Sequence, residues 1–275
     1  MIVDAHFHCW RLSRGDYGWL TPALAPIYRD VSIDDWRREA GAVGVAGGVL
    51  VQAAPTEAET LFLLEQAAQH DAVLGVVGWV DLVAHDAPDR IARLCASSAK
   101  LCGLRPMLQD IDDPDWILRP QLESALHAMA TRGLVFDALI KPIHLPRIRA
   151  LCSRHPTLQV VIDHGAKPDI TRSEWEPWAS EIERIAQETN AVCRLSGLLT
   201  ETGPHPRVDA ARRWEQHLLQ SFGPERLLWG SDWPVLELAA RYGDWWNEVQ
   251  SLLQKLTDFE RDAVLGRNAW RVYRL

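Results

Sequence analysis

The sequence has no hydrophobic run long enough to cross a membrane. Apolar residues make up 47% and charged residues 24% of the 275 residues, as in ordinary globular proteins. No uncharged apolar stretch reaches the ~20 residues that a membrane-spanning helix needs. We therefore expect a globular protein in aqueous solution, without a membrane partner.

An excess of basic residues is also absent. Lys and Arg together number 29 against 37 Asp and Glu, so the formal net charge is −8, and the basic residues form no cluster. Proteins that bind nucleic acid usually present a basic face, because binding releases the counterions of the phosphates. Nucleic acid is therefore not an expected partner.

Signals for export are missing as well. The chain begins with Asp4, His6 and His8 where a signal peptide would have a basic and then an apolar region. The five cysteines are odd in number, widely spaced and without a CxxC pair, which disfavours a disulfide framework and a cysteine zinc site. They are Cys9, Cys95, Cys102, Cys152 and Cys193. These features favour the reducing cytoplasm.

What the sequence does contain is an alternation of short apolar runs with longer stretches of helical periodicity, which is typical of parallel strands joined by helices. The eight runs are residues 2–8, 47–53, 73–81, 101–107, 134–140, 159–164, 191–198 and 227–232. Helices are expected over residues 33–42, 56–70, 122–132, 145–154, 178–189, 210–222 and 241–255. Eight alternations predict a closed α/β barrel of the (β/α)8 TIM type.

No linker or internal repeat divides the chain, so residues 1–275 are interpreted as one barrel domain. Ser32 is expected to cap the first helix, and Thr56 with Glu59 to form a capping box for the second. The least regular segments, 11–30 and 111–119, follow the first and fourth strands. They are expected to cover the mouth of the barrel, where loops shape substrate choice.

The first predicted strand ends in the sequence His6-Phe7-His8. Residues two apart in a strand point to the same side, so the two imidazoles are expected to face the barrel interior together. Such a pair can bind a divalent ion or donate hydrogen bonds to a carbonyl oxygen that gains charge. A packed, purely structural pair of histidines has the same spacing.

Two further polar residues stand at the ends of predicted strands. His164 follows an apolar run at the sixth strand, and Asp232 follows another at the eighth. Barrel enzymes place their catalytic residues at the carboxyl ends of the strands. Asp232 could instead cap the next helix or pair with an arginine, but its convergence with three histidines favours a catalytic site.

These residues resemble the amidohydrolase superfamily, which has an HxH pair on strand one, a histidine on strand six and an aspartate on strand eight. Shorter motifs resemble its lactonase branch, which contains L-fuconolactonase, L-rhamnonolactonase and pyrone dicarboxylate lactonase. The motifs are Asp16-Tyr17-Gly18-Trp19-Leu20, Val51-Gln52-Ala53, Gly103-Leu104-Arg105, Asp163-His164-Gly165-Ala166-Lys167-Pro168, Ser196-Gly197-Leu198 and Gly230-Ser231-Asp232-Trp233-Pro234. The resemblance spans the whole predicted barrel.

The resemblance implies a hydrolase that opens a small sugar lactone, with one departure from the metal-dependent members. Binuclear relatives carry a carboxylated lysine at the end of strand four, where this chain has Arg105. A guanidinium there would repel a second cation. No cofactor is therefore expected to be required, although His6, His8, His164 and Asp232 could hold a single Zn²⁺.

The expected mechanism assigns Asp232 as the general base that activates water and later protonates the ring oxygen. His6, His8 and His164 would polarise the lactone carbonyl. A zinc-dependent decarboxylase or a pyrone dicarboxylate lactonase of the same superfamily is the alternative, and a catalytically idle binding barrel is a third possibility. The oligomeric state is left between monomer and homodimer.

Residues expected to contact the substrate lie near the ends of other predicted strands. They are Arg105, Gln52, His144, Lys141, Trp10, Trp79 and Trp233. The tryptophans offer flat faces to sugar C–H groups and N–H donors to hydroxyls, which favours a polyol lactone over a planar diacid. Asp163 and Lys167, beside His164, are expected to orient its imidazole.

Overall fold

The computed structural model describes residues 1–203 and 208–275, and its centre is one parallel sheet whose strands follow chain order. Each strand is short, because only three to six residues pair before the chain turns outward at the mouth. The strands are β1 (Val3–Phe7), β2 (Gly47–Val51), β3 (Val73–Gly78), β4 (Leu101–Leu104), β5 (Val135–Ala138), β6 (Val160–Ile162), β7 (Val192–Leu195) and β8 (Leu227–Trp229). The predicted (β/α)8 barrel is confirmed.

The sheet closes on itself just beyond the end of β8. The N–H of Asp232 donates to the carbonyl of His6 at 2.8 Å, and the N–H of His8 donates to that of Trp233 at 2.8 Å. Every strand runs in the same direction, so the carboxyl ends of all eight meet at one mouth. Closure therefore places Asp232 directly beside the histidine pair.

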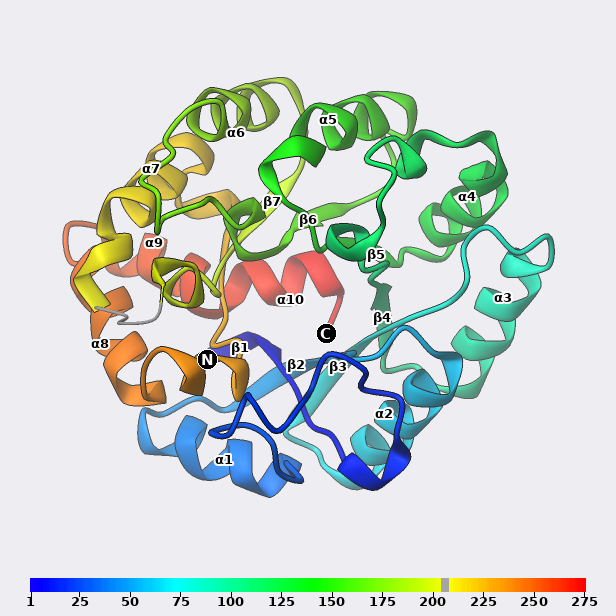
Figure 1. Ribbon diagram of the computed structural model, residues 1–275, viewed down its shortest axis with the longest axis horizontal. Helices are drawn as coiled ribbons and strands as arrows, with labels where there is room; N and C mark the ends of the chain where they lie inside the picture. Colours follow the sequence, from blue (N-terminus) through cyan, green and yellow to red (C-terminus); the bar gives the residue numbers. More distant parts are fainter. Residues whose placement is uncertain (204–207) are drawn as a thin grey trace.

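Most of the helices surround the strands as an outer ring, whereas α10 (Asn268–Tyr273) crosses one end of the barrel, as Figure 1 shows. The other helices are α1 (Ile33–Ala42), α2 (Glu57–Gln69), α3 (Ala87–Ser97), α4 (Glu123–Arg132), α5 (Leu145–Arg154), α6 (Trp178–Glu188), α7 (Arg212–Phe222), α8 (Tyr242–Leu252) and α9 (Asp258–Asp262). The predicted helices 33–42 and 145–154 match α1 and α5 to the residue. The helix α3 was not predicted; it begins with Ala87-Pro88 and buries Ile91 and Leu94 against the barrel.

The predicted N-caps of α1 and α2 can be compared with the structure. Ser32 caps α1 with the reciprocal bonds of a capping box, formed with Asp35. Thr56 caps α2 by accepting from the N–H of Glu59, but the Glu59 carboxylate accepts from the N–H groups of Ala53 and Ala54 instead of completing the box. Glu59 therefore bonds to the loop after β2 instead of to the backbone N–H of Thr56.

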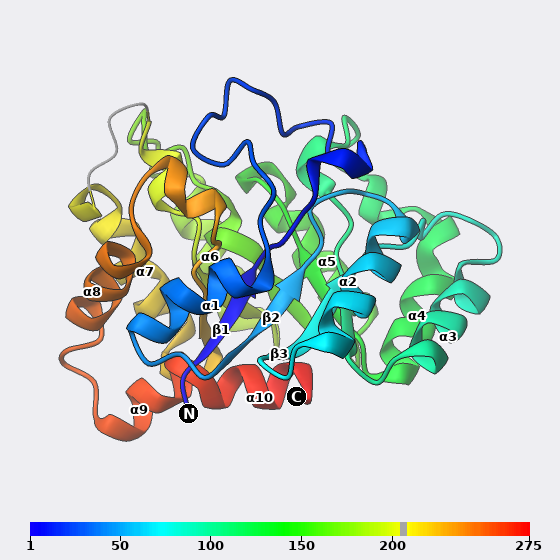
Figure 2. The same ribbon diagram turned by 90° about the horizontal axis from the view of Figure 1, so that it is seen from below.

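The two ends of the barrel differ. Figure 2 shows α10 beneath the strands, near both termini, while the segment after β1 arches over the opposite end. That segment contains only one short helical turn, Leu12–Arg14, and residues 111–119 contain another, Trp116–Leu118. The mouth is thus covered by irregular chain, and the other end by a helix.

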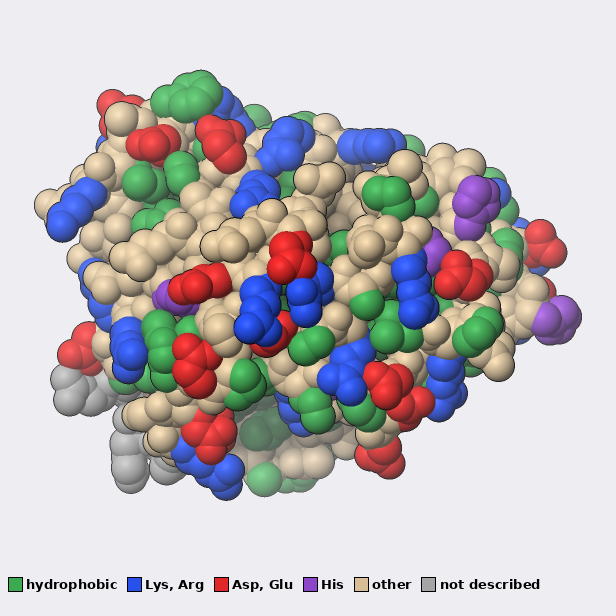
Figure 3. Space-filling model, turned by 90° about the horizontal axis from the view of Figure 1, so that it is seen from above, with side chains coloured by type: hydrophobic (Ala, Val, Ile, Leu, Met, Phe, Trp, Pro, Cys, Tyr) green, Lys and Arg blue, Asp and Glu red, His purple; other side chains and the backbone are tan. Residues whose placement is uncertain are grey.

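The surface and the cysteines agree with the composition. On the flank seen in Figure 3, acidic and basic side chains alternate without a patch of one sign. The five cysteines are all free. Within the described residues, no helix combines the length and apolar character needed to span a membrane.

Candidate active site

The histidine pair lies at the top of β1, as its spacing predicts. His6 and His8 are both buried, and their Nε2 atoms lie 3.0 Å apart. His8 Nδ1 lies 2.7 Å from the carbonyl oxygen of Val51, at the end of the neighbouring strand β2. The two imidazoles therefore converge on one point in the barrel interior.

Asp232 completes this group from the other side of the closure. Its Oδ1 lies 3.3 Å from Nε2 of His8, 3.4 Å from Nε2 of His6 and 3.9 Å from Nε2 of His164. Its φ of 59° is in the left-handed region, which is costly for a residue other than glycine. The backbone bond to His6 holds this conformation and directs the carboxylate at the imidazoles.

A buried carboxylate at the start of β1, which sequence analysis did not single out, fixes the turn before Asp232. Asp4 Oδ1 accepts from the N–H of Ser231 at 2.8 Å, and its Oδ2 accepts from the hydroxyl of Ser231 at 2.6 Å. Trp36 and Tyr242 also donate to Oδ2, at 3.0 and 2.9 Å. Burial raises the pKa of Asp4, although these bonds oppose the rise. Asp4 therefore positions the Asp232 turn without facing the mouth.

His164 approaches from the turn that follows β6. Its φ is 50°, and its Nδ1 lies 2.9 Å from the hydroxyl of Ser196. A Cβ added to Gly197 would stand 2.5 Å from Nδ1 of His164, so the motif Ser196-Gly197 leaves the space that this imidazole occupies. This explains the presence of both residues after β7.

Arg105 and Gln52 form a reciprocal pair beside the imidazoles. Gln52 Nε2 donates to the carbonyl of Arg105 at 2.9 Å, and Arg105 Nη2 donates to the backbone carbonyl and side chain of Gln52. Arg105 Nη1 lies 3.2 Å from Asp163 and 3.5 Å from Nε2 of His6. The guanidinium is thus a fixed positive charge next to the histidine pair.

Beneath the imidazoles lies a second buried charged group, which the sequence analysis missed. Arg194 of β7 donates from Nη1 to Asp163 and, at 2.7 Å, to Nδ1 of His6. From Nη2 it donates to Asp137 at 2.9 Å and to the hydroxyl of Tyr273 in α10. The available signal was a lone arginine in an otherwise apolar strand, Val192–Leu195.

Burial and neighbouring charges set the protonation of the site. Burial, reinforced for His6 by the charge of Arg194, lowers the pKa of His6 and His8, and it lowers that of His164 to about 3. Burial alone would raise the pKa of Asp232, but His164, the hydrogen bond with His8 and the charge of Lys167 lower it to about 2. At neutral pH the site therefore holds three neutral imidazoles and one ionised carboxylate.

The proton positions on the imidazoles bear on metal binding. A neutral His8 that donates from Nδ1 to Val51 has a lone pair at Nε2, as a metal ligand needs. Arg194 can only donate, so Nδ1 of His6 accepts and its Nε2 carries the proton. His6, His8 and Asp232 are close enough together to surround one ion. The contact of His6 with Arg194 and the nearby charge of Arg105 nevertheless suit a tightly held cation poorly.

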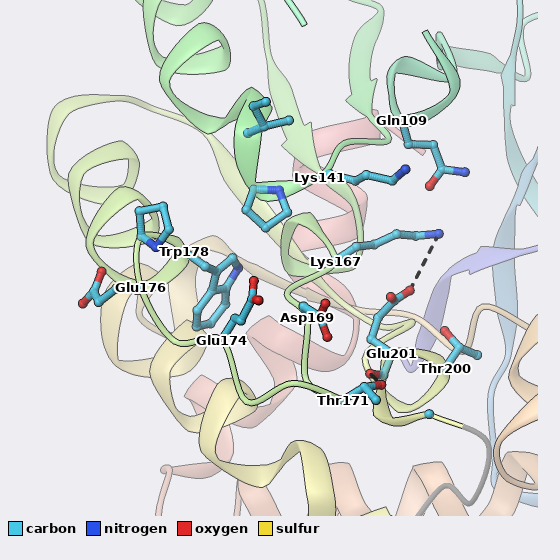
Figure 4. Close-up of a pocket in the computed structure, with 14 residues that line it drawn as sticks. Gln109, Lys141, Lys167, Asp169, Thr171, Glu174, Glu176, Trp178, Thr200 and Glu201 are labelled. Atoms are coloured by element: carbon cyan, nitrogen blue, oxygen red, sulfur yellow. Dashed lines mark hydrogen bonds and ion pairs between the residues drawn. The ribbon is translucent and has the colours of Figure 1, made fainter. Parts of the chain in front are cut away.

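A cavity of about 670 Å³ opens at the mouth above β4 to β7. In Figure 4 the Lys141 and Lys167 side chains extend side by side, with Gln109 and Glu201 nearby. Lys167 Nζ lies 3.9 Å from a carboxylate oxygen of Glu201. The positive charge of Lys167 lowers the pKa of both Asp232 and His164. Lys167 thus faces the cavity, whereas it was expected to orient the imidazole of His164.

Of the other residues predicted to contact the substrate, three are hydrogen-bonded within the protein and one lines a second cavity. The indole N–H of Trp10 donates to the carbonyl of Arg29, and that of Trp233 donates to Glu237, so neither is available to a ligand hydroxyl. His144 is buried and accepts from the N–H of Lys141 through Nδ1. Trp79 lines a second cavity, above β1 to β4.

Comparison with known proteins places this geometry in a family. The model of the family described as amidohydrolase matches residues 3–275. A curated relative from Burkholderia ambifaria, named L-fucono-1,5-lactonase, is 43% identical over 99% of this chain and 95% of its own length. A second relative of that name, from Burkholderia multivorans, is 34% identical over 99% of this chain and 96% of its own length.

A solved structure shares the fold closely. It is a crystal structure of an amidohydrolase from Burkholderia multivorans with bound zinc, 32% identical, with a TM-score of 0.94 and coverage of 100% of this chain and 99% of that one. The resemblance inferred from the motifs is therefore confirmed at the level of the family.

Proposed function

The chain belongs to the amidohydrolase family, and on that premise we propose that it hydrolyses a small sugar lactone to the open sugar acid. The observation that carries the proposal is the buried carboxylate of Asp232, whose Oδ1 lies 3.3–3.9 Å from Nε2 of three imidazoles at the barrel mouth. The names of the two Burkholderia relatives support a lactone as the substrate, and L-fucono-1,5-lactone is the first compound to test.

Asp232 acts as the general base in this proposal. It takes a proton from water as the water oxygen attacks the lactone carbonyl carbon, which forms a tetrahedral intermediate. Asp232 then gives that proton to the ring oxygen as the carbon–oxygen bond breaks, so one carboxylate serves both steps. The product acid loses its own proton to solvent.

The intermediate carries negative charge on the former carbonyl oxygen. The protonated Nε2 of His6 points at the group formed with His8 and Asp232. The guanidinium of Arg105 stands 3.5 Å from the same nitrogen, and Asp163 and Gln52 fix its direction. Preorganised donors and charges of this kind stabilise an oxyanion more effectively than mobile water does. His8 and His164 complete the polar wall.

The charge of the mouth cavity favours a neutral polyol over a dianion. Two lysines line it, Lys141 and Lys167, but so do four carboxylates. These are Asp169, Glu174, Glu176 and Glu201. A planar dicarboxylate would meet net negative charge there, whereas the hydroxyls of a sugar lactone can both donate to carboxylates and accept from the lysines. The pyrone dicarboxylate alternative is therefore the weaker candidate.

We further propose that catalysis does not require a metal, because Arg194 directs the lone pair of His6 away from the Asp232 group. A single zinc ion would have His8 and Asp232 as its best-oriented ligands and would polarise the carbonyl, but every step above is assigned to protein groups. The bound zinc of the Burkholderia multivorans structure makes this a point that must be tested.

One assay tests the reaction class and the metal requirement together. Acid release from a panel of aldonolactones is followed with a pH indicator, before and after chelation and dialysis. We expect L-fucono-1,5-lactone or a close isomer to be hydrolysed at an unchanged rate after chelation. Activity that disappears on chelation and returns with zinc would refute metal independence. Carbon dioxide release from aromatic acids, without lactone hydrolysis, would favour the decarboxylase.

A further inference from the structure

A second cavity at the mouth, of about 510 Å³, has a different chemistry from the first. It lies above β1 to β4 and is lined by three tryptophans, Trp19, Trp79 and Trp116, and by aspartates. Among the described residues that line it, none is Lys, Arg or His. The short turn Leu108–Asp110 separates the two cavities, because Gln109 lines the first and Asp110 the second.

The three tryptophans are only partly buried, unlike most large aromatic side chains of the chain. Trp19 is 37% exposed, whereas Trp36 and Trp245 are each 1% exposed. Several partly exposed tryptophans around one hollow leave apolar surface in contact with water, which usually marks a binding site. The expectation of tryptophan faces for a sugar therefore applies to this cavity, through Trp79, rather than to the enclosed rings of Trp10 and Trp233.

The wall of this cavity is already rigid. The indole N–H of Trp19 donates to the carbonyl of Ala53 at 2.7 Å, and its ring meets Trp10 edge to face at 5.6 Å. Oδ2 of Asp16 accepts from Arg14 at 2.7 Å and from Thr56 at 3.1 Å. A site ordered in advance loses less entropy when a ligand binds.

One acceptor in the wall lacks a partner. Oδ1 of Asp16 is buried and has no hydrogen bond within the described residues. Because that atom is enclosed by protein, the carboxylates of Asp81 and Asp110, which line the cavity and are at least partly exposed, are the acceptors that the cavity offers to a ligand hydroxyl. Carboxylates that accept from hydroxyls, together with indole faces that pack on C–H groups, suit a sugar ring. The aspartates and the lack of lining cations oppose an anion.

We propose that this cavity binds a neutral sugar ring, separately from the lactone site at Asp232. The tryptophan cavity then accepts the neutral ring, and in the first cavity Lys141 and Lys167 are the cations that can pair with the single carboxylate of the open acid. The proposal goes beyond the proposed hydrolysis, because binding of a neutral sugar requires no turnover.

Titration calorimetry of the full chain with L-fucose, a neutral sugar that cannot be hydrolysed, tests this site. Trp116→Ala should weaken binding about fivefold, the value of about 1 kcal/mol for an aromatic contact. Asp110→Asn should weaken it about threefold, the smaller effect expected of one exposed acceptor. The matched controls Tyr28→Ala, an exposed aromatic outside the cavity, and Asp112→Asn, from the same loop, should leave it unchanged.

Two further ligands and one further variant make the result decisive. The affinity for sodium L-fuconate should fall in Lys167→Gln and stay unchanged in Trp116→Ala. Absence of L-fucose binding overturns the proposal, as does L-fucose binding that responds to Lys167→Gln but not to Trp116→Ala. Preferential binding of tetramethylammonium would make the cavity a cation site and also overturn it. Lactone hydrolysis by the same preparations is scored independently, so either proposal can fail alone.

Discussion

Arg194 and Asp232 are both charged and both withdrawn from water, but their surroundings differ. Arg194 is 0% exposed, and its two terminal nitrogens donate to two carboxylates, an imidazole and a phenol. Asp232 is 5% exposed, and its nearest polar neighbours are three imidazoles that are neutral at pH 7. Ion pairs hold the inner group together, whereas the carboxylate of Asp232 at the mouth has no ion pair with a Lys or Arg among the described residues.

This difference suggests a division of roles. Ion pairs compensate the burial of the inner charges, so that group is expected to matter mainly for stability. The charge of Asp232 is held by dipoles and by more distant cations, which leaves its proton affinity available to the reaction. Substitutions that preserve shape but remove charge can separate the two roles.

The largest expected effect is on turnover. Asp232→Asn should reduce kcat for the best lactone by roughly 10²–10⁴-fold, because it removes general acid–base catalysis. The urea midpoint of unfolding should fall as well, because the lowered pKa of Asp232 means that its charged form stabilises the folded protein at neutral pH. Steady-state kinetics and urea denaturation of the same preparation measure both. Near-normal turnover in this variant would exclude Asp232 as the base.

The complementary substitution acts on the inner group. Arg194→Met leaves the carboxylate of Asp137 buried without its cation and leaves Asp163 with Arg105 alone, so we expect a loss of roughly 3–5 kcal/mol in the free energy of unfolding. Tyr273→Phe removes one hydroxyl from the same group and should cost about 1–3 kcal/mol, which keeps the test available if the first variant does not fold. An Arg194→Met protein with an unchanged free energy of unfolding would contradict the division of roles.

The stability of the mouth group should depend on pH in a predictable direction. His164 has a folded-state pKa of about 3 against an ordinary value of 6.5, so between these values the unfolded chain binds a proton that the folded chain does not. Stability is therefore complete above pH 6.5 and falls as the pH drops toward 3, by up to about 1.4 kcal/mol per pH unit for this group.

Asp232 adds to this loss at lower pH. Its depressed pKa contributes stability that is present above pH 3.8 and is lost as the pH falls toward 2. Urea unfolding from pH 7 to pH 4 measures the histidine contribution. His164→Asn should flatten that profile, and an equally steep profile in this variant would show that His164 is not its source.

The smallest expected effects concern the lysines of the first cavity. Lys167→Gln and Lys141→Gln should each raise KM for the lactone by roughly two- to tenfold, as expected for the loss of one charge-assisted hydrogen bond. Lys167→Gln should also raise the pH at which activity falls in acid, because it removes a cation that lowers the pKa of Asp232. Lys255→Gln, an exposed lysine outside the mouth, is the matched control. An unchanged KM in both cavity variants would place the lactone elsewhere.

The barrel was largely predictable because its signals are local and repeated. Each strand is a short apolar run, and each of the seven expected helices is present with its ends shifted by a few residues at most. The helix α3 was not among the expected helices, although Pro88 stands in its first turn, where proline is favoured. The Glu59 carboxylate was expected to accept a hydrogen bond from the N–H of Thr56, but it accepts from the N–H of Ala53 instead. Local sequence rules do not include such a contact, because it depends on the tertiary structure.

The candidate site was predictable to the extent that strand ends are recognisable. The sequence by itself determined that His6 and His8 share a direction and that His164 and Asp232 end parallel strands at the same mouth, because strand periodicity and barrel closure require it.

The surroundings of the three histidines and of Asp232 could be learned only from the folded structure. Residues of β1, β5 and α10 and of the turn after β6 meet around Arg194 of β7. These residues lie far apart in the chain, and their arrangement sets the proton position on His6. The same is true of the mouth, where Lys167 turns toward one cavity and Trp79 toward another. The partners of a side chain inside a barrel depend on how the barrel closes and on the paths of its loops. Both bring together residues that are distant in the sequence, so sequence patterns do not predict these contacts.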